Sequence, residues 1–260
     1  MPSVRTIRSS KNDSSAPLTM LTAYDAVTAS IVESCDIDMI LVGDSMGETV
    51  LGYGSTLPVE LDAIVSRTDA ITKVTDEALV VADLPFLSTG VEQTESIRNC
   101  GRLMKQAGAD AVKIESGSHT VELTSRLVEL GIPVMAHIGL TPQRVKEAGY
   151  QQQGDTPEDA ERLVKLAERH ASAGAFATVL EHIPHSLAQR ITQVVDIPTI
   201  GIGAGPHCDG QVLVIHDVLG LSEDPPPFAQ EFGSVRQEIE TAVESYRDAV
   251  ESHRFPSDTE

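Results

Sequence analysis

Acidic side chains stand at the ends of several short apolar runs in this chain. Asp44 follows DMILVG, Asp83 ends ALVVAD, Glu115 ends DAVKIE and Glu181 ends AFATVLE. Carboxylates are the oxygen ligands that Mg2+ prefers, and they also serve as enzyme acids and bases. If the first three runs are neighbouring strands, their carboxylates repel one another unless a cation lies between them. The pattern predicts a Mg2+ site formed by Asp44, Asp83 and Glu115.

The alternation of side chains along a strand indicates which residues share this site. In VKIE, Val112 and Ile114 suit a face covered by helices, so Lys113 and Glu115 are expected to point the other way, into the barrel. Lys113 is then a fixed cation that can bind a substrate carboxylate. Its alternative role is a salt bridge to a nearby acid.

The same parity applies to the two preceding acidic runs. It turns Asp83 inward together with Leu79 and Val81, and we expect it to turn Asp44 inward together with Val42. For a single strand-end Asp, capping the next helix or facing water is a competing explanation. Three such acids on consecutive strands, joined by an inward lysine, favour the metal site.

Two further polar residues end later strands. His137, in MAHIGLTPQ, can hydrogen-bond a substrate oxygen or transfer a proton, or it is an ordinary buried histidine. Glu181 lies opposite the three predicted metal ligands in strand order. A carboxylate that the metal does not need is a natural general base, with a helix-capping role as the alternative.

These residues must be positioned by alternating strands and helices. The apolar runs number eight, and longer amphipathic stretches such as 91–108 and 156–174 separate most of them. The expected strands lie within 18–25, 38–45, 78–86, 110–116, 132–139, 175–182, 197–205 and 211–220. Repeated β-α units predict an α/β fold, a single (β/α)8 TIM barrel over residues 1–260, with an open doubly wound sheet as the alternative. A final helix is expected over 228–252, to complete the ring or to pack on a partner.

Composition limits the classes of partner. The formal net charge of −20 argues against nucleic acid and against an acidic membrane surface, because both require clustered Lys and Arg. No apolar run approaches the roughly 18 residues of a membrane span, and no secretory signal is visible at the start, so we expect a cytoplasmic protein. The acidic excess favours adaptation to molar salt over a merely acidic soluble protein.

The ordered motifs resemble those of the ketopantoate hydroxymethyltransferase family. The matching stretches are LTAYD, LVGDSMG, GSTLPV, ADLPF, GADAVKIE, HIGLTPQ, VLEHIP, IPTIGIGAG and DGQVLVIHDVLG, in the family's order from about Leu18 to Leu221. The resemblance implies a barrel of the phosphoenolpyruvate/2-oxo-acid type.

The resemblance also implies an activity and the residues that carry it. A hydroxymethyl group would pass from 5,10-methylenetetrahydrofolate to 3-methyl-2-oxobutanoate, giving 2-dehydropantoate through a Mg2+-stabilised enolate. One Mg2+ per subunit would be held by Asp44, Asp83 and Glu115. The implied 2-oxo acid contacts are Asp44, Ser45, Asp83, Lys113 and His137, with Glu181 as the proton acceptor. The family further implies a homo-oligomer, typically a decamer.

Some positions differ from the usual family pattern. Ser116 follows Glu115 where glycine is commoner, and Asp155 stands where a basic residue is frequent. These differences concern the folate contacts and the subunit packing that the family implies, with a general acidic bias of the surface as the alternative explanation. One competing reading is a barrel lyase or aldolase that binds a 2-oxo acid on Mg2+. None of the three cysteines has the loop setting that such lyases use. Another is a non-catalytic ligand-binding barrel, which loss of Glu181 or of the metal ligands would favour, and all of these are present.

Overall fold

The computed structural model describes residues 3–12 and 16–257, and its centre is a closed barrel of eight parallel strands. Each strand pairs with the next one along the chain, and β8 closes the ring on β1. The strands are β1 (Leu18–Thr22), β2 (Met39–Val42), β3 (Leu79–Asp83), β4 (Ala111–Glu115), β5 (Val134–Gly139), β6 (Ala177–Glu181), β7 (Thr199–Ile202) and β8 (Gly210–Leu213). The predicted (β/α)8 fold and all eight predicted strands are confirmed, whereas the open-sheet alternative is wrong.

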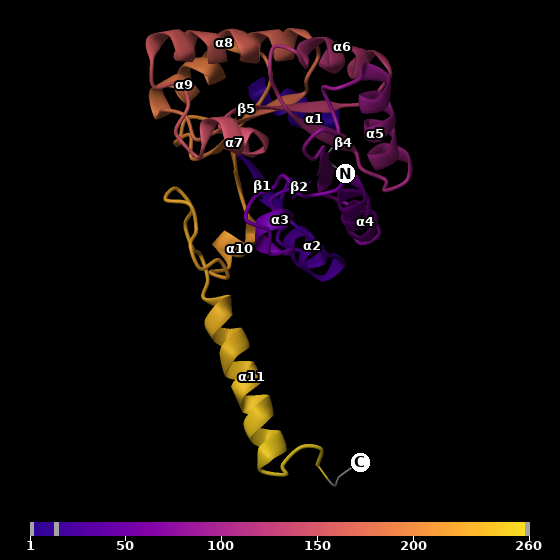
Figure 1. Ribbon diagram of the computed structural model, residues 1–260, viewed down its shortest axis with the longest axis vertical. Coiled ribbons are helices and arrows are strands. Elements are labelled where there is room, and N and C mark those ends of the chain that lie inside the picture. Colours follow the sequence, from indigo (N-terminus) through magenta and orange to yellow (C-terminus); the bar gives the residue numbers. More distant parts are fainter. Residues whose placement is uncertain (1–2, 13–15, 258–260) are drawn as a thin grey trace. The chain divides into compact units, whose positions relative to one another are not determined.

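Helices follow most of the strands and cover the outside of the barrel (Figure 1). The N-terminal segment forms α1 (Val4–Ser9) and a 3-10 turn, η1 (Ser10–Asn12). The barrel helices are α2 (Ala26–Glu33), α3 (Met46–Thr49), α4 (Leu61–Thr72), α5 (Gln93–Lys105), α6 (Val121–Glu129), α8 (Pro157–Ser172) and α9 (His185–Val194). Between β5 and α8 lie the 3-10 turn η2 (Pro142–Arg144) and the short α7 (Val145–Ala148). In Figure 1, α8 and α9 lie side by side, and the two helices are in contact.

Two apolar layers hold the barrel together. The interior layer is one buried cluster that includes Leu79, Val81, Ala111, Met135 and Val179. The outer layer packs strand residues of the opposite parity, such as Ala136, Ile138 and Leu180, against α8 and α9. Each fully buried aliphatic side chain contributes roughly 1.5–3 kcal/mol. The core therefore needs few aromatic residues, in agreement with their 3% share.

Helix α8 has the termini that its sequence predicts. The Thr156 hydroxyl accepts a hydrogen bond from the backbone N–H of Asp159 at 3.2 Å, and Pro157 opens the first turn. Gly174 follows the helix with a φ of 96°, a conformation that glycine adopts without strain. The Asp159 carboxylate accepts a hydrogen bond from the Gly154 backbone at 2.6 Å, which ties the preceding loop to the helix.

The described residues up to Leu213 form a first compact unit, and the described residues from Val214 onward form the second. It contains α10 (Ile215–Val218) and α11 (Val235–Glu251), so the predicted C-terminal helix is confirmed with a later start. The closed barrel lies wholly within the first unit, and the expectation of one domain over 1–260 stays a prediction. Within the described ranges, no helix is long and apolar enough to cross a membrane.

A buried histidine connects α8 to the loop after β4. His170 is fully buried, with its Nδ1 3.0 Å from Thr124 Oγ1 and its Nε2 3.3 Å from the Gly117 carbonyl oxygen. Burial disfavours the imidazolium and lowers the pKa of His170 from 6.5 to about 4. The folded protein therefore keeps this ring neutral at pH values where the unfolded chain protonates it.

This difference predicts a loss of stability in mild acid. Above about pH 6.5, His170 is neutral in both the folded and the unfolded chain. Between pH 6.5 and 4 only the unfolded chain protonates it, which lowers the free energy of unfolding by on the order of 3 kcal/mol across this range. We expect the free energy of unfolding of the wild type to fall more steeply than that of His170→Gln over this range, in denaturant titrations at fixed salt. Parallel curves for the two proteins would contradict the assignment.

Candidate active site

The strand register brings the predicted site residues to the same end of the barrel. Asp83 at the end of β3 is the register partner of Lys113 on β4, and Glu115 is the partner of His137 on β5. Ala111 belongs to the interior cluster, so Lys113 and Glu115, at the same parity, also face the barrel interior. The predicted inward direction of these two residues is confirmed.

Lys113 and Asp83 form a buried ion pair. Lys113 Nζ donates to Asp83 Oδ2 at 2.6 Å, and the two side chains are only 5% and 2% exposed. Burial by itself lowers the pKa of Lys113, but Asp83, Asp44 and Glu115 outweigh it, so this pKa is above its usual value. Its neighbours thus favour the charged form of Lys113, and the structure shows the salt bridge to a nearby acid that was the alternative role for this lysine.

Asp44 reaches the site from a turn and not by strand parity. Met39 and Leu41 are in the interior cluster, so Val42 faces outward and the predicted inward pairing of Val42 with Asp44 is wrong. Strand β2 ends at Val42, and Asp44 lies in the turn that leads into α3. Because the chain bends there, the alternation that holds inside the strand no longer predicts the direction of the Asp44 side chain, which is nevertheless buried.

Gln143 connects two of the predicted metal ligands, and the sequence reasoning assigned it no role. Its side-chain amide donates to Asp44 Oδ2 and to the Leu84 carbonyl oxygen, both at 2.9 Å. Its backbone N–H points at the Glu115 carboxylate, 3.2 Å from either oxygen. Gln143 is in the turn η2, directly after the HIGLTP segment, so its motif was visible although its contacts were not.

The carboxylates of Asp44 and Glu115 are held in an environment that disfavours their charge. Burial and the nearby Asp83 raise the pKa of Asp44 to about 7, although Lys113 and the Gln143 amide act in the opposite direction. Burial and Asp44 likewise raise the pKa of Glu115 well above its ordinary value. One lysine does not neutralise three ionised acids, so without a further cation the site favours the protonated forms of Asp44 and Glu115.

His137 and Glu181 face each other on neighbouring strands. His137 Nε2 lies 3.0 Å from Glu181 Oε2, but the direction is wrong for a hydrogen bond, and neither imidazole nitrogen has a hydrogen-bond partner among the described residues. The pair is therefore a close contact and not a hydrogen bond. Gly139, the register partner of Glu181, has a φ of 105°, and a Cβ there would lie 2.2 Å from the Glu181 carbonyl oxygen. Only glycine allows β5 and β6 to approach so closely here.

Two tyrosines contact polar residues at the start of α3, and the sequence had predicted no role for either of them. The Tyr24 hydroxyl lies 2.8 Å from the hydroxyl of Ser45, the predicted substrate contact. Tyr150 donates to Glu48 Oε1 at 3.1 Å, and burial raises the pKa of both groups, that of Tyr150 to about 12. Both tyrosines belong to recognisable segments, LTAYD and GYQQQGDT, but a tyrosine alone carries no signal for such a role.

The residues present suit a divalent cation in their chemistry, although they are not arranged around one. Within the described part of the chain, no group of three acidic, histidine or cysteine side chains is placed to hold a metal ion. The Oδ1 atom of Asp83 is nevertheless buried without a hydrogen-bond partner, and Asp44 and Glu115 have raised pKa values. An unpartnered buried carboxylate oxygen beside two repelling acids is a donor set for a hard cation. The ligand set Asp44, Asp83 and Glu115 stays a prediction.

Comparison with known proteins adds a family to this geometry. Residues 2–258 match the family described as ketopantoate hydroxymethyltransferase. The 3-methyl-2-oxobutanoate hydroxymethyltransferase of Haloarcula marismortui is 60% identical over 259 residues, which cover 100% of this chain and 96% of that protein. The enzyme of the same name from Halobacterium salinarum is 57% identical over 260 residues, with 99% and 95% covered.

Solved structures show a likeness in fold alone. A 2,3-dimethylmalate lyase of the PEP mutase/isocitrate lyase superfamily aligns with a TM-score of 0.61 at 15% identity, covering 100% of this chain and 92% of that one. A phosphonopyruvate hydrolase aligns with a TM-score of 0.66 at 12% identity, covering 99% and 90%. These likenesses agree with the predicted (β/α)8 barrel fold of the chain.

The buried ion pair generates a prediction about stability. Lys113→Met leaves the Asp83 carboxylate buried without its counter-charge, so we expect a loss of about 3–5 kcal/mol in the free energy of unfolding. Urea titrations at neutral pH with a chelator present would measure it, since no metal can then replace the lysine charge.

The matched control for this prediction is the double variant Lys113→Met/Asp83→Asn, which removes the charge that Lys113→Met leaves unpaired. It should recover a large part of the lost stability, as a double-mutant cycle would reveal. If Lys113→Met is as stable as the wild type, or if the double variant is no more stable than Lys113→Met, the Lys113–Asp83 ion pair does not stabilise the barrel.

Proposed function

We propose that the acids at the end of the barrel catalyse, through an enolate, the reaction of the ketopantoate hydroxymethyltransferase family. The chain belongs to this family. The chain is an enzyme that transfers a hydroxymethyl group to 3-methyl-2-oxobutanoate, a step of pantothenate biosynthesis. The proposed donor is 5,10-methylenetetrahydrofolate, and the proposed product is 2-dehydropantoate. The carrying observation is the excess of buried carboxylate around Lys113.

The difficulty of the reaction lies in removing a proton from C3 of the 2-oxo acid, which is a poor acid in water. Asp44, Asp83 and Glu115 would hold one Mg2+, which when bound supplies a Lewis acid that stabilises negative charge developing on the keto oxygen. The unpartnered Asp83 Oδ1 supports this assignment. The Lys113 ammonium, buried and fully charged, would offset the charge of the substrate carboxylate.

The remaining residues would orient the substrate and move the proton. Ser45 would donate a hydrogen bond to the 2-oxo acid, with its hydroxyl fixed by Tyr24. Glu181 would take the C3 proton, because it lies on β6, is partly exposed and has no hydrogen bond from Gln143 or Lys113 to hold it. His137, 3.0 Å away, would bind a substrate oxygen and limit the positions that the Glu181 carboxylate can take.

The carbon–carbon bond then forms between C3 and the one-carbon unit of the donor, while the donor's carbon–nitrogen bonds break. Because the methylene group of the donor carries no oxygen, the new hydroxyl oxygen comes from water. A homo-oligomer, with a decamer as the expected form, is part of the same proposal. The lyase alternative has in its favour the likeness of fold to a 2,3-dimethylmalate lyase at 15% identity.

The proposed role of Glu181 predicts the behaviour of a variant. In deuterated water with Mg2+ and no donor, the wild type should exchange the C3 proton of 3-methyl-2-oxobutanoate, and Glu181→Gln should lower that rate by at least about 100-fold, since a general base contributes roughly 10²–10⁴. Binding of the 2-oxo acid should persist. Proton NMR of the substrate measures the exchange, and calorimetry measures the binding.

The control variant is Glu129→Gln, which removes an exposed carboxylate on α6 that pairs with Arg126. It should exchange C3 at the wild-type rate, and it should incorporate the one-carbon unit only when the donor is added. Exchange retained in Glu181→Gln would assign the base to another residue. Exchange without any transfer from the folate donor would reject the proposed co-substrate and leave the enolate chemistry in place.

A further inference from the structure

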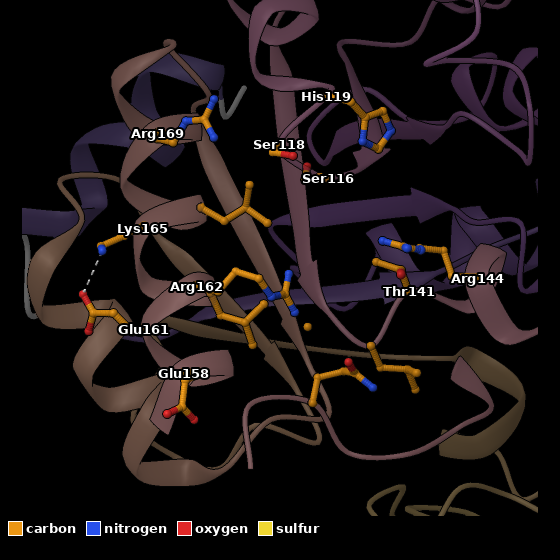
Figure 2. A pocket seen from close by; sticks show the side chains of 16 residues that line it. Ser116, Ser118, His119, Thr141, Arg144, Glu158, Glu161, Arg162, Lys165 and Arg169 are labelled. Carbon is orange, nitrogen blue, oxygen red and sulfur yellow. Dashed lines mark ion pairs between the residues drawn. The ribbon is translucent and has the colours of Figure 1, made fainter. Parts of the chain in front are cut away.

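A large cavity beside the site is lined by a concentration of basic side chains. Its volume is about 1010 Å³, and it lies between α8, the loop after β4 and the end of β5 (Figure 2). Its polar lining includes Ser116, Ser118, His119, Thr141, Arg144, Gln153, Glu158, Glu161, Arg162, Lys165 and Arg169. Four permanent cations thus face two carboxylates, in a chain whose formal net charge is −20. A positively charged cavity in so acidic a protein indicates an anionic ligand.

The side chains come from both sides of this cavity. In Figure 2, Arg162 extends from α8 toward the centre, and Arg144 lies on the opposite side near Thr141. Arg162 also pairs with Asp159 on its own helix, which fixes its position at the wall. Arg169, one helical turn beyond Lys165, has no hydrogen bond or ion pair from its guanidinium to a described residue, so it is available to a ligand.

A second, smaller cavity borders both this basic cavity and the proposed active site. It measures about 190 Å³ and is lined by Glu115 and Gln143, two residues of the site. It shares five lining residues with the larger cavity, namely Ser116, Gly117, His119, Thr141 and Arg144. Its other side is apolar and includes Phe86, Leu87 and Val91, which are 39%, 62% and 63% exposed. The two cavities are therefore adjacent, and together they outline a path from the carboxylate cluster to the basic wall of α8.

We propose that this path binds the pterin donor, with its ring in the small cavity and its anionic tail in the basic cavity. The inference rests on the proposed function, because that reaction needs a second substrate with a flat ring and a carboxylate tail. The donor's one-carbon unit must reach C3 of the 2-oxo acid, so its ring lies at the Glu115 end, against Phe86. The tail then extends toward Arg144, Arg162 and Arg169, which suit carboxylate groups.

The tail of such a donor carries anionic carboxylate groups. Donors that differ in the number of these groups therefore test the proposal. We would compare 5,10-methylenetetrahydrofolate with one glutamate, the same donor with a pentaglutamate tail, and methylenetetrahydropteroate, which lacks glutamate. All assays would be run at one ionic strength, because salt screens these contacts. In the wild type, the KM for the donor should fall as glutamates are added.

The variants Arg162→Gln and Arg169→Gln should lose this discrimination. We expect each to raise the KM for glutamylated donors by about tenfold, the cost of one charge-assisted hydrogen bond, and that for the donor without glutamate by less than about twofold. Arg162→Lys, which keeps the charge, should recover part of the affinity. Arg126→Gln on α6, which removes a cation outside both cavities, serves as the matched control and should behave as the wild type.

The donor-independent exchange of the C3 proton separates this proposal from the proposed function. If exchange is normal in the arginine variants while the KM for glutamylated donors rises, the basic cavity is the tail site. If the wild type does not distinguish the three donors, or if the arginine variants raise the KM for all donors equally, the proposal is overturned although the enolate chemistry stands. Loss of exchange in the wild type itself would instead reject the proposed function.

Discussion

The site depends on one electrostatic imbalance, namely two buried carboxylates and a half-buried third one gathered around a single buried lysine. Lys113 pairs with Asp83 at 2.6 Å, while burial and mutual repulsion raise the pKa values of Asp44 and Glu115. Burying an uncompensated charge costs several kcal/mol, so the barrel tolerates this cluster only with further stabilisation. Gln143 supplies part of it through donors to Asp44 and Glu115. A bound cation would neutralise the remaining carboxylate charge, and an anionic substrate would then bind to that cation and to Lys113.

The barrel makes the imbalance possible because it fixes the positions of the strand ends. Parallel strands β3 and β4 bring Asp83, Lys113 and Glu115 to one end in a set register, above a buried, apolar barrel interior. Gly139 then lets β6 approach β5, which carries Glu181 to His137. The acids that would hold a metal and the acid that would move the proton are thereby separated by one strand. Such a separation is how two classes of carboxylate take different roles in one site.

The sequence was sufficient for the parts of the fold that follow from local periodicity. Alternation within strands predicted the inward direction of Asp83, Lys113 and Glu115, and capping chemistry predicted the start of α8. It was insufficient where the chain leaves a regular element. Asp44 lies past the end of β2, where parity no longer applies, and Gln143 acts through contacts with residues far away in the sequence. The basic cavity could not be read from the chain either, because its cations are spread over segments that only the fold brings together.

The most direct test of the central claim is the binding of Mg2+ to the protein without substrates. Isothermal calorimetry on the wild type and on Asp83→Asn, at equal salt, would measure it, with circular dichroism to verify that both are folded. We predict one saturable site per chain in the wild type and an affinity that is weaker by at least about tenfold in Asp83→Asn. Equal affinity in the two proteins, or no saturable binding in the wild type, would contradict the assignment of the carboxylate cluster as a metal site.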